Sequence, residues 1–391
     1  MSSLDQYAIA ELEALEQRHM RRQLAPTHRH AGLWVERQGK TLLSFSCNDY
    51  LGLTHDPRVI NAAQDAIALY GAGAGASRLI SGNYPLLEIL EQKLAALKGT
   101  ETACVFGSGY LANTGIISTL IGKGDLILLD EWVHSCIWSG ARLSGARIMA
   151  FRHNDMMHVQ SLLSQHRSHF KNCLIAVDGV YSMDGDKALL PALATLAPDY
   201  DAWLLCDDAH GAGVIGGGRG TSFDFDAPIA LDLNMGTLSK AFGSYGGYVC
   251  ASSSIIHLLK TRAASFVYST ALPAASAGAA CAALDIIRDE PERSMRPLRL
   301  AQRFTQALHL PLAQSAIVPV IIGQSETALM LSRAMEDKGF LVVAIRPPTV
   351  PDGTARLRFT FSAAHQESDI DDAAQCLTDL LRQHQINLSA A

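Results

Sequence analysis

The sequence predicts an α/β protein, with a mostly parallel seven-stranded sheet in a large domain followed by a smaller α+β domain. Two observations support this fold class. Short apolar runs bounded by Gly, Asp or Ser alternate with helical stretches from about residue 100 to residue 252. Such runs are typical of strands buried on both faces, and their alternation with helices favours a parallel sheet. After about residue 285, charged helices and shorter strands indicate a separate unit.

We divide the 391 residues into three parts. Residues 1–45 are expected to form an N-terminal segment packing with the small domain, 46–285 the large domain, and 286–391 the small domain. The first 25 residues have the apolar spacing of an amphipathic helix. In the large domain the expected strands are 102–106, 126–129, 147–151, 173–177, 203–206, 231–235 and 247–251. In the small domain, strands are expected at 316–322, 341–345 and 356–361, and helices at 288–303, at 326–338 and from 367.

Composition excludes several classes of function. The net charge of −6 implies no broad basic surface, so we expect neither nucleic acid nor an anionic membrane as the main partner. No apolar run reaches the length of a membrane span, and the charged N-terminus lacks the core of a signal peptide. The eight cysteines are scattered without a CxxC pair, as reduced structural cysteines are. We therefore expect a cytoplasmic protein.

Lys240 is the first candidate for chemistry. It stands among small residues at 236–243, directly after an apolar run. A lysine buried at the end of a strand must pair with another group or lose its charge. A lysine with a lowered pKa is a nucleophile for an aldehyde. An exposed lysine in a turn would explain this segment equally well.

Asp207 and His210 strengthen the catalytic interpretation. They follow the hydrophobic run that begins at Trp203, and ligands of a parallel sheet bind at the carboxyl ends of its strands. The cofactor pyridoxal 5′-phosphate (PLP) needs a carboxylate at its pyridine nitrogen, which keeps the ring protonated as an electron sink. It also needs a donor near its 3-hydroxyl group. Asp207 and His210 supply these groups, and Asp208 is expected to point the other way, toward backbone amides.

The same segment contains a misleading motif. Residues 211–216 match GxGxxG after a strand, which is the fingerprint of dinucleotide binding. That fingerprint must open a helix, yet further glycines follow up to Gly220. We therefore do not expect this motif to bind a nicotinamide cofactor.

Other strand ends offer weaker signals. Gly109 and Tyr110 lie in a Gly-rich turn that suits a phosphate at a helix N-terminus, although a simple tight turn would look the same. His134 can stack on a flat ring or be an ordinary core histidine. Ser182 is a possible donor to the cofactor. The aspartates of 184–186 have no third metal ligand at a suitable spacing, so they are interpreted as turn residues and no metal is expected.

Together these motifs resemble the α-oxoamine synthases. The resemblance rests on SKAFG around Lys240, DDAHG at 207–211, SMDGD at 182–186 and SCNDYLGL at 46–53, and it extends from about residue 21 to 365. These are PLP-dependent enzymes of fold type I that join an amino acid to an acyl thioester with loss of CO2. The segment AIRPPTVPDGTARLR at 344–358 is most similar to the member that uses L-alanine and a pimeloyl thioester in biotin synthesis.

The resemblance implies a role for each candidate. Lys240 would carry PLP as a Schiff base and act as acid and base at Cα, Asp207 would pair with the pyridinium, and His134 would stack on the ring and assist catalysis. The remaining cofactor contacts would be Gly109, Tyr110, Ser182, His210 and Thr237, the last through the phosphate. Arg346 would bind the carboxylate of the amino acid, and Arg22 and Thr349 the acyl substrate. Residues 268–270 would reach the neighbouring subunit of a homodimer, which places the active site at the subunit interface.

Some questions stay open at this point. The acyl carrier is either CoA or a carrier protein. Arg22, at the end of the first helix, is either a solvated helix end or an anion site for the distal carboxyl group of pimelate. The alternatives to the whole interpretation are a synthase that uses glycine and another acyl-CoA, a non-catalytic relative lacking the lysine, and a nicotinamide-dependent oxidoreductase.

Overall fold

The computed structural model describes residues 1–17, 20–22, 24–30, 32–386 and 388. The chain divides into two units, which are described separately. The first comprises 1–46, 319–359 and 375–391, and the second 47–318 and 360–374. The sequence predicts a domain boundary near residue 285, whereas residues 286–318 belong to the large unit. The reason is local packing, since Ser294 lies in the helix after residue 290 and is close to Gly218 of the large unit.

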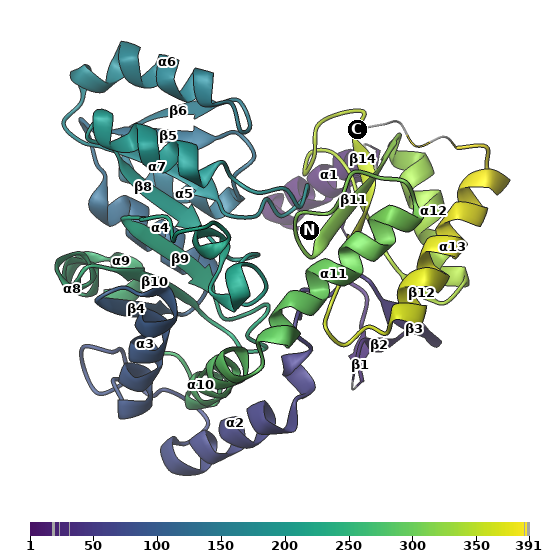
Figure 1. Cartoon of the computed structure of the whole chain (residues 1–391), viewed down its shortest axis with the longest axis horizontal. Helices are drawn as coiled ribbons and strands as arrows, with labels where there is room; N and C mark the ends of the chain where they lie inside the picture. Colours follow the sequence, from purple (N-terminus) through teal and green to yellow (C-terminus); the bar gives the residue numbers. More distant parts are fainter. Residues whose placement is uncertain (18–19, 23, 31, 387, 389–391) are drawn as a thin grey trace. The chain divides into compact units, whose positions relative to one another are not determined.

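The large unit is built on a seven-stranded sheet (Figure 1). Its strand order is β4-β10-β9-β8-β7-β5-β6, and β10 alone runs antiparallel to its neighbours. Six of the seven strands therefore end at the same edge of the sheet. The strands are β4 (Thr102–Phe106), β5 (Leu126–Asp130), β6 (Arg147–Phe151), β7 (Cys173–Asp178), β8 (Trp203–Asp207), β9 (Leu233–Thr237) and β10 (Gly247–Ala251).

The sequence pattern and these strands agree closely because most of the strands are buried on both faces. Every residue of β5, β7, β9 and β10 is buried. The edge strand β6 is the exception, with only Phe151 fully buried. The prediction that β6 is buried on both faces was wrong, whereas β4 at the other edge of the sheet is buried apart from the half-buried Thr102.

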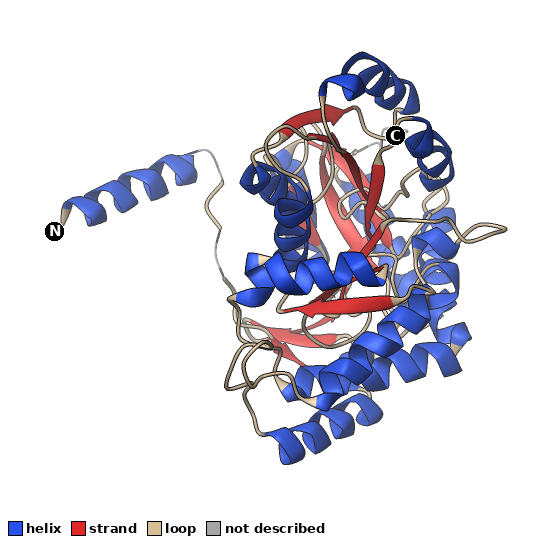
Figure 2. Ribbon diagram, turned by 90° about the vertical axis from the view of Figure 1, so that its left-hand side faces the viewer, coloured by secondary structure: helices blue, strands red, loops and turns tan. Residues whose placement is uncertain are grey.

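Helices cover both faces of this sheet (Figure 2). One apolar core joins α4, α5, α6 and α7 to consecutive residues of β5 and β7, whose side chains point to both faces of the sheet, and a second core packs α3 and α10 against β4 and β10. The helices of the unit are α2 (Pro57–Tyr70), α3 (Pro85–Lys98), α4 (Gly109–Leu120), α5 (Ser135–Ser144), α6 (Met156–His166), α7 (Leu190–Asp199), α8 (Ser253–Arg262), α9 (Ala264–Val267), α10 (Ala274–Asp289) and α11 (Pro291–Ala307). Short 3-10 turns are Leu53–His55, Arg167–His169, Gly216–Gly218 and Thr221–Phe223.

The smaller unit contains two sheets. One has the order β1-β2-β3-β12, with β12 parallel to β3, and the other has the order β11-β14-β13. The predicted strand 341–345 is split between them, since β12 pairs with β3 and β13 with β14. The elements are α1 (Ser3–Gln17), β1 (His28–Arg29), β2 (Trp34–Arg37), β3 (Lys40–Ser44), β11 (Ile317–Gly323), α12 (Ser325–Asp337), β12 (Phe340–Leu341), β13 (Val343–Ile345), β14 (Ala355–Thr360) and α13 (Glu367–Gln383), of which β11, β14 and α13 extend across the unit boundary.

In the part of the chain that the structure describes, no helix has both the length and the apolar character needed to cross a membrane. The eight cysteines are thiols, and six of them are buried.

Candidate active site

A cavity of about 190 Å³ lies at the edge of the sheet where the parallel strands end. Strands that run the same way bring the residues after their ends together, which is why this edge collects side chains from distant parts of the sequence. Ser182, which was predicted to join them, lies in the turn after β7 and is not among the residues lining the cavity. Seven of the predicted residues line it: Gly109, Tyr110, His134, Asp207, His210, Thr237 and Lys240.

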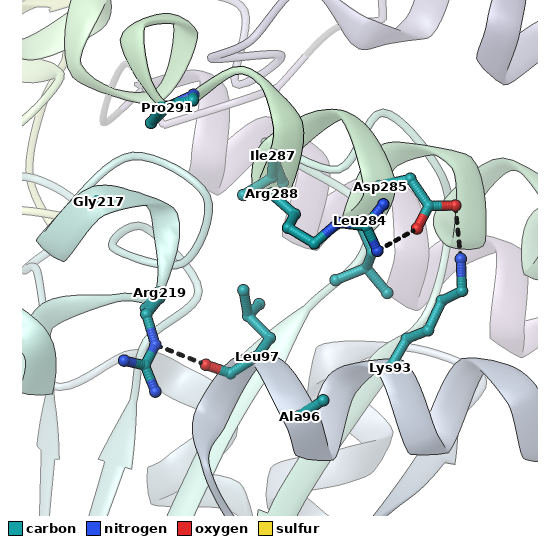
Figure 3. A pocket seen from close by; sticks show the side chains of 10 residues that line it. All are labelled: Lys93, Ala96, Leu97, Gly217, Arg219, Leu284, Asp285, Ile287, Arg288 and Pro291. Atoms are coloured by element: carbon teal, nitrogen blue, oxygen red, sulfur yellow. Dashed lines mark hydrogen bonds and ion pairs between the residues drawn. The ribbon is translucent and has the colours of Figure 1, made fainter.

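A larger cavity of about 350 Å³ lies elsewhere in this unit, between α3 and α10 (Figure 3). Its charged groups are already paired with neighbours. Lys93 and Arg288 both contact the carboxylate of Asp285, and Arg219 donates to the carbonyl of Leu97 at 2.9 Å. The smaller cavity is therefore the better candidate for the active site, since it is lined by side chains that can take part in catalysis.

Lys240 lies in the loop between β9 and β10, in contact with a buried chain of hydrogen bonds. Its Nζ is 2.8 Å from Nε2 of His210, and Nδ1 of His210 is 2.7 Å from the hydroxyl of Tyr50. Tyr50 in turn donates to Oδ1 of Asn48 at 3.2 Å. Because the Tyr50 hydroxyl donates to Asn48, it accepts a hydrogen bond from Nδ1–H of His210. This leaves Nε2 of His210 as an acceptor that faces the lysine. No role was predicted for Tyr50 from the sequence.

A tight turn fixes the backbone around Lys240. Gly243 has a φ of 59°, and a Cβ there would approach the carbonyl carbon of Leu53 to 2.8 Å. Only glycine fits such a position without strain. The Gly243 amide donates to the Lys240 carbonyl at 2.9 Å, so the lysine is held at the mouth of the cavity.

Asp207 is the last residue of β8 and is buried. Its Oδ2 accepts a hydrogen bond of 2.7 Å from Nδ2 of Asn113, and its Oδ1 accepts from the amide of Ala209 at 3.0 Å. Asn113 lies within α4 and is completely buried. This amide orients the carboxylate at the cavity wall. Asn113 was not predicted as a site residue, although it lies four residues after Gly109.

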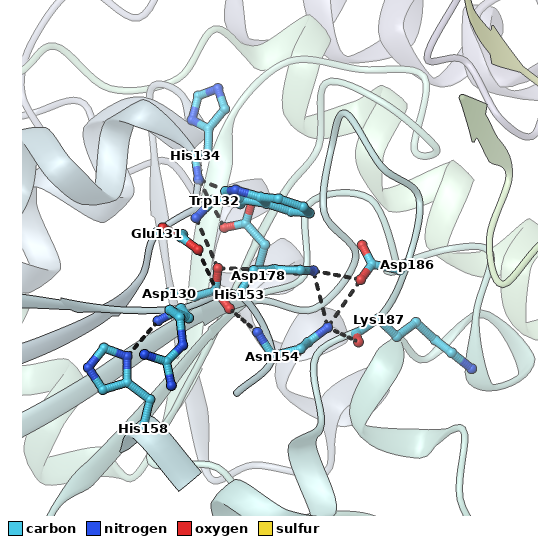
Figure 4. Close-up of polar contacts among 11 residues, drawn as sticks. Asp130, Glu131, Trp132, His134, His153, Asn154, His158, Asp178, Asp186 and Lys187 are labelled. Carbon is cyan, nitrogen blue, oxygen red and sulfur yellow. Dashed lines mark hydrogen bonds and ion pairs between the residues drawn. The ribbon is translucent and has the colours of Figure 1, made fainter. Parts of the chain in front are cut away.

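His134 caps the start of α5, and a second buried carboxylate holds its backbone (Figure 4). The His134 amide donates to both oxygens of Asp178, at 3.3 and 3.1 Å. Burial lowers the pKa of the His134 imidazole below its ordinary value; the Asp207 carboxylate opposes this shift and Lys240 adds to it. Burial raises the pKa of Asp178 well above its usual range, and neighbouring Asp207 raises it further. The imidazole is therefore neutral at pH 7, as a group that accepts a proton must be.

The turn between β4 and α4 presents the start of a helix to the cavity. Ser108 caps this helix by accepting from the Leu111 amide at 3.2 Å. A Cβ on Gly109 would lie 3.3 Å from Met235 Cε, so the glycine lets the helix start approach β9 closely. Backbone amides at such a helix start bind anions. Thr237 donates its hydroxyl to the Gly246 carbonyl at 2.8 Å, so a phosphate contact would require this hydroxyl to change partner.

Asp208 points away from the cavity, toward a backbone amide as expected. Its Oδ1 accepts from the amide of Thr221 at 3.1 Å, and its Oδ2 forms an ion pair of 2.7 Å with Nζ of Lys98. Both side chains are almost completely buried. The pair joins α3 to the loop after β8 and therefore stabilises the fold next to the site.

Changing Asp208 to asparagine should destabilise the protein by about 3–5 kcal/mol, because Lys98 would remain as a buried charge without its partner. Denaturant unfolding followed by circular dichroism measures this loss. The matched control is Asp201→Asn, whose side chain is 92% exposed in its contact with Arg167, and it should cost less than about 1 kcal/mol. Equal stability of the two variants would contradict this account of the pair.

The glycine-rich segment after Asp208 does not open a helix in the manner of a dinucleotide site. Gly213, Gly216 and Gly218 have positive φ angles, and only a 3-10 turn forms at Gly216–Gly218. The misleading GxGxxG motif is therefore a compact loop. Among the residues that the structure describes, no group of three or more His, Cys, Asp or Glu is arranged to hold a metal ion.

Three predicted substrate contacts lie in the other unit. Arg346 and Thr349 follow β13, and Arg22 is an exposed residue after α1. Their roles stay predictions.

The groups of the cavity fit PLP. A lysine amine suits the aldehyde, a buried carboxylate oriented by Asn113 suits the pyridine nitrogen, and amides at the start of α4 suit the phosphate.

Comparison with known proteins agrees with this chemistry. Residues 40–377 match the family model "Aminotransferase class I and II". An 8-amino-7-oxononanoate synthase of Beijerinckia indica is 55% identical over 97% of this chain and 99% of its own, and one of Methylocella silvestris is 58% identical over 89% and 99%. A solved serine palmitoyltransferase from S. paucimobilis, with PLP and myriocin bound, superposes with a TM-score of 0.91 at 29% identity, covering 98% of this chain and 99% of its own.

The family model matches most of the chain, and the two synthases are each more than 50% identical to it over nearly their full length. Together these matches show the family. The chain belongs to the class I and II aminotransferase family and, within it, to the 8-amino-7-oxononanoate synthases, which are PLP-dependent acyltransferases of fold type I.

Proposed function

We propose that this chain condenses L-alanine with a pimeloyl thioester, with loss of CO2, to give 8-amino-7-oxononanoate for biotin synthesis. The observation that carries the proposal is the meeting of Lys240, Asp207 and His210 in one cavity, in a chain that is 55% identical to such a synthase. PLP supplies a protonated ring that takes up the negative charge developing at Cα. All other steps fall to side chains of the protein.

Lys240 acts as the base that removes the Cα proton of alanine and later returns a proton to that carbon. Its amine lies 2.8 Å from His210 Nε2, so it has a neighbour that orients its lone pair. Asp207 keeps the ring nitrogen protonated. The buried setting and the hydrogen bond from Asn113 prevent water from competing for this carboxylate.

His134 would stack on the ring, and it would assist proton transfer or orient the thioester carbonyl. Its lowered pKa keeps it neutral, so that it can accept a proton. The family resemblance supports Ser182, Thr237, Gly109 and Tyr110 as further cofactor contacts. It also supports Arg346 as the group that binds the alanine carboxylate through a bidentate pair.

Arg22 and Thr349 bind the acyl substrate in this proposal, and Arg22 pairs with a free distal carboxyl group of pimelate. The donor is pimeloyl-CoA or a pimeloyl carrier protein. We further propose that the protein acts in the cytoplasm as a homodimer in which residues 268–270 reach the neighbouring site. Tyr268 is 87% exposed, which is unusual for a tyrosine outside an interface.

The test is an assay of the purified protein with PLP, L-alanine and either pimeloyl-CoA or a pimeloyl carrier protein, with product detected by mass spectrometry. We expect 8-amino-7-oxononanoate. Replacing alanine with glycine should lower the rate about tenfold or more, because one methyl group in a fitted pocket has roughly that effect. L-Serine is included because the solved neighbour acts on a serine substrate by its name. A higher rate with glycine or serine would replace this proposal with another synthase of the group.

A further inference from the structure

A second cluster of polar groups lies beside the candidate site, centred on His153 (Figure 4). The His153 side chain is 13% exposed and lies between two carboxylates. Its Nδ1 is 3.1 Å from Oδ1 of Asp130, and its Nε2 is 2.7 Å from Oδ2 of Asp186. The ring of Trp132 stacks on the imidazole with centroids 3.9 Å apart and an interplanar angle of 17°.

This geometry defines the charge of His153. A neutral imidazole has one donor and one acceptor nitrogen, so one of the two carboxylates would face a lone pair. With both nitrogens protonated, each carboxylate accepts a hydrogen bond, and the stacked indole favours the cation as well. Burial alone lowers the pKa of His153, but the hydrogen bonds to Asp130 and Asp186 raise it to about 9.

The two carboxylates belong to two different loops that flank the cavity. Asp130 ends β5, and its Oδ1 also accepts from the Trp132 amide at 2.9 Å, which fixes the start of the loop leading to His134. Asp186 lies in the turn after β7 that contains Ser182, and its carbonyl accepts from the Tyr181 amide at 3.0 Å. His153 thus contacts both loops through its side chain.

We propose that His153, as an imidazolium held between Asp130 and Asp186, is a positioning residue that sets the loop of His134 against the turn of Ser182. This inference rests on the proposed function of those two residues. It names no contact between His153 and substrate. The neighbouring residue Asn154 supports the same arrangement, since its amide donates to Asp130 at 2.9 Å and its Nδ2 to Asp186 at 3.1 Å.

Other titratable groups surround the cluster. Glu131 accepts from the His153 amide at 3.0 Å through its carboxylate, and the ring of Tyr181 meets the imidazole edge-on at 4.4 Å. Burial raises the pKa of Tyr181 well above its ordinary value, so its phenol stays neutral. Lys187 pairs instead with Asp224 at 2.6 Å.

Tryptophan fluorescence reports this charge directly, because an imidazolium stacked on an indole quenches its emission more strongly than neutral imidazole does. In wild-type holoenzyme we expect emission to rise with a midpoint near pH 9. The rise should be lost in His153→Gln and in Trp132→Phe. It should persist in His169→Gln, a matched change at an exposed histidine. A rise that persists in His153→Gln would overturn the imidazolium assignment.

Asp186→Asn tests whether the two carboxylates hold the charge of His153, without removing the histidine itself. With one carboxylate lost, the fluorescence midpoint should fall by about one unit or more, toward that of an ordinary histidine. An unchanged midpoint would show that Asp186 does not hold the charge and would overturn the proposal. This variant also covers the case in which His153→Gln folds poorly, because Asp186 is 28% exposed and lies in a turn.

Kinetics test the positioning role. In His153→Gln we expect kcat to fall roughly 10–100-fold, because small displacements of catalytic groups have such effects, while the KM for L-alanine changes little. The difference in kcat between the wild type and the variant should become smaller as pH rises through about 9, where His153 of the wild type loses its positive charge. A wild-type kcat in the variant would overturn the proposal. The fluorescence titration needs neither substrate nor turnover. It can therefore contradict the role of His153 independently of whether the proposed reaction is correct.

Discussion

Lys240→Ala should abolish condensation, lowering kcat by roughly 10⁴-fold or more, because the change removes both the covalent attachment to PLP and the base at Cα. The fold should survive, since Lys240 is a half-buried loop residue whose backbone is fixed by Gly243. Steady-state assays with L-alanine and pimeloyl-CoA measure the loss, and circular dichroism checks the fold.

The control for Lys240→Ala is Lys123→Ala, which removes an exposed lysine between α4 and β5. Its turnover should match the wild type. Near-normal turnover in Lys240→Ala would show that another amine performs the chemistry, and the assignment of the cavity as the active site would fall with it.

Asp207→Asn should lower kcat by roughly 10²–10³-fold, as loss of a preorganised electrostatic group does in other sites. The amide has nearly the same shape and its oxygen can still accept the hydrogen bond from Asn113. What is lost is the negative charge that keeps the ring nitrogen protonated. Stability should change little by comparison with Asp208→Asn, where a buried ion pair is broken.

These adjacent aspartates thus separate two kinds of effect. Asp207→Asn is expected to impair turnover at near-normal stability, and Asp208→Asn to impair stability. Turnover of Asp207→Asn within about tenfold of the wild type would mean that the ring nitrogen has a different partner.

Much of the large unit was predictable from the sequence, because most of its strands are fully buried. A strand such as β7 has no solvent-facing side, so all of its residues are apolar until the terminal Asp178. Such runs stand out between helices and end at recognisable polar residues. The strand ends in turn predicted most of the cavity, since parallel strands bring their carboxyl ends to one edge.

The parts that were missed depend on contacts distant in sequence. Asn113 looks like an ordinary helix residue, and only the fold brings its amide to 2.7 Å from Asp207. Tyr50 lies 160 positions before its partner His210. His153 follows an exposed edge strand, and its two carboxylates come from separate loops. No local pattern identifies such partners.

The smaller unit was harder to predict for a different reason. Its strands are short, and β12 has only two residues. The continuous apolar stretch at 341–345 therefore did not indicate that its two ends pair with strands of different sheets. The two-residue strand β1 and the β2–β3 hairpin were missed as well. Arg22, Arg346 and Thr349 belong to this unit, and their roles rest on the resemblance alone.

The central claim is that Lys240 carries PLP at the edge of the sheet. Borohydride reduction of the holoenzyme fixes the cofactor to the lysine that holds it, and peptide mass spectrometry then locates the modified residue. The account predicts a phosphopyridoxyl group on Lys240, with none on the buried Lys98 or the exposed Lys123. Modification of a different lysine, or of none in a protein that turns over alanine, would contradict it.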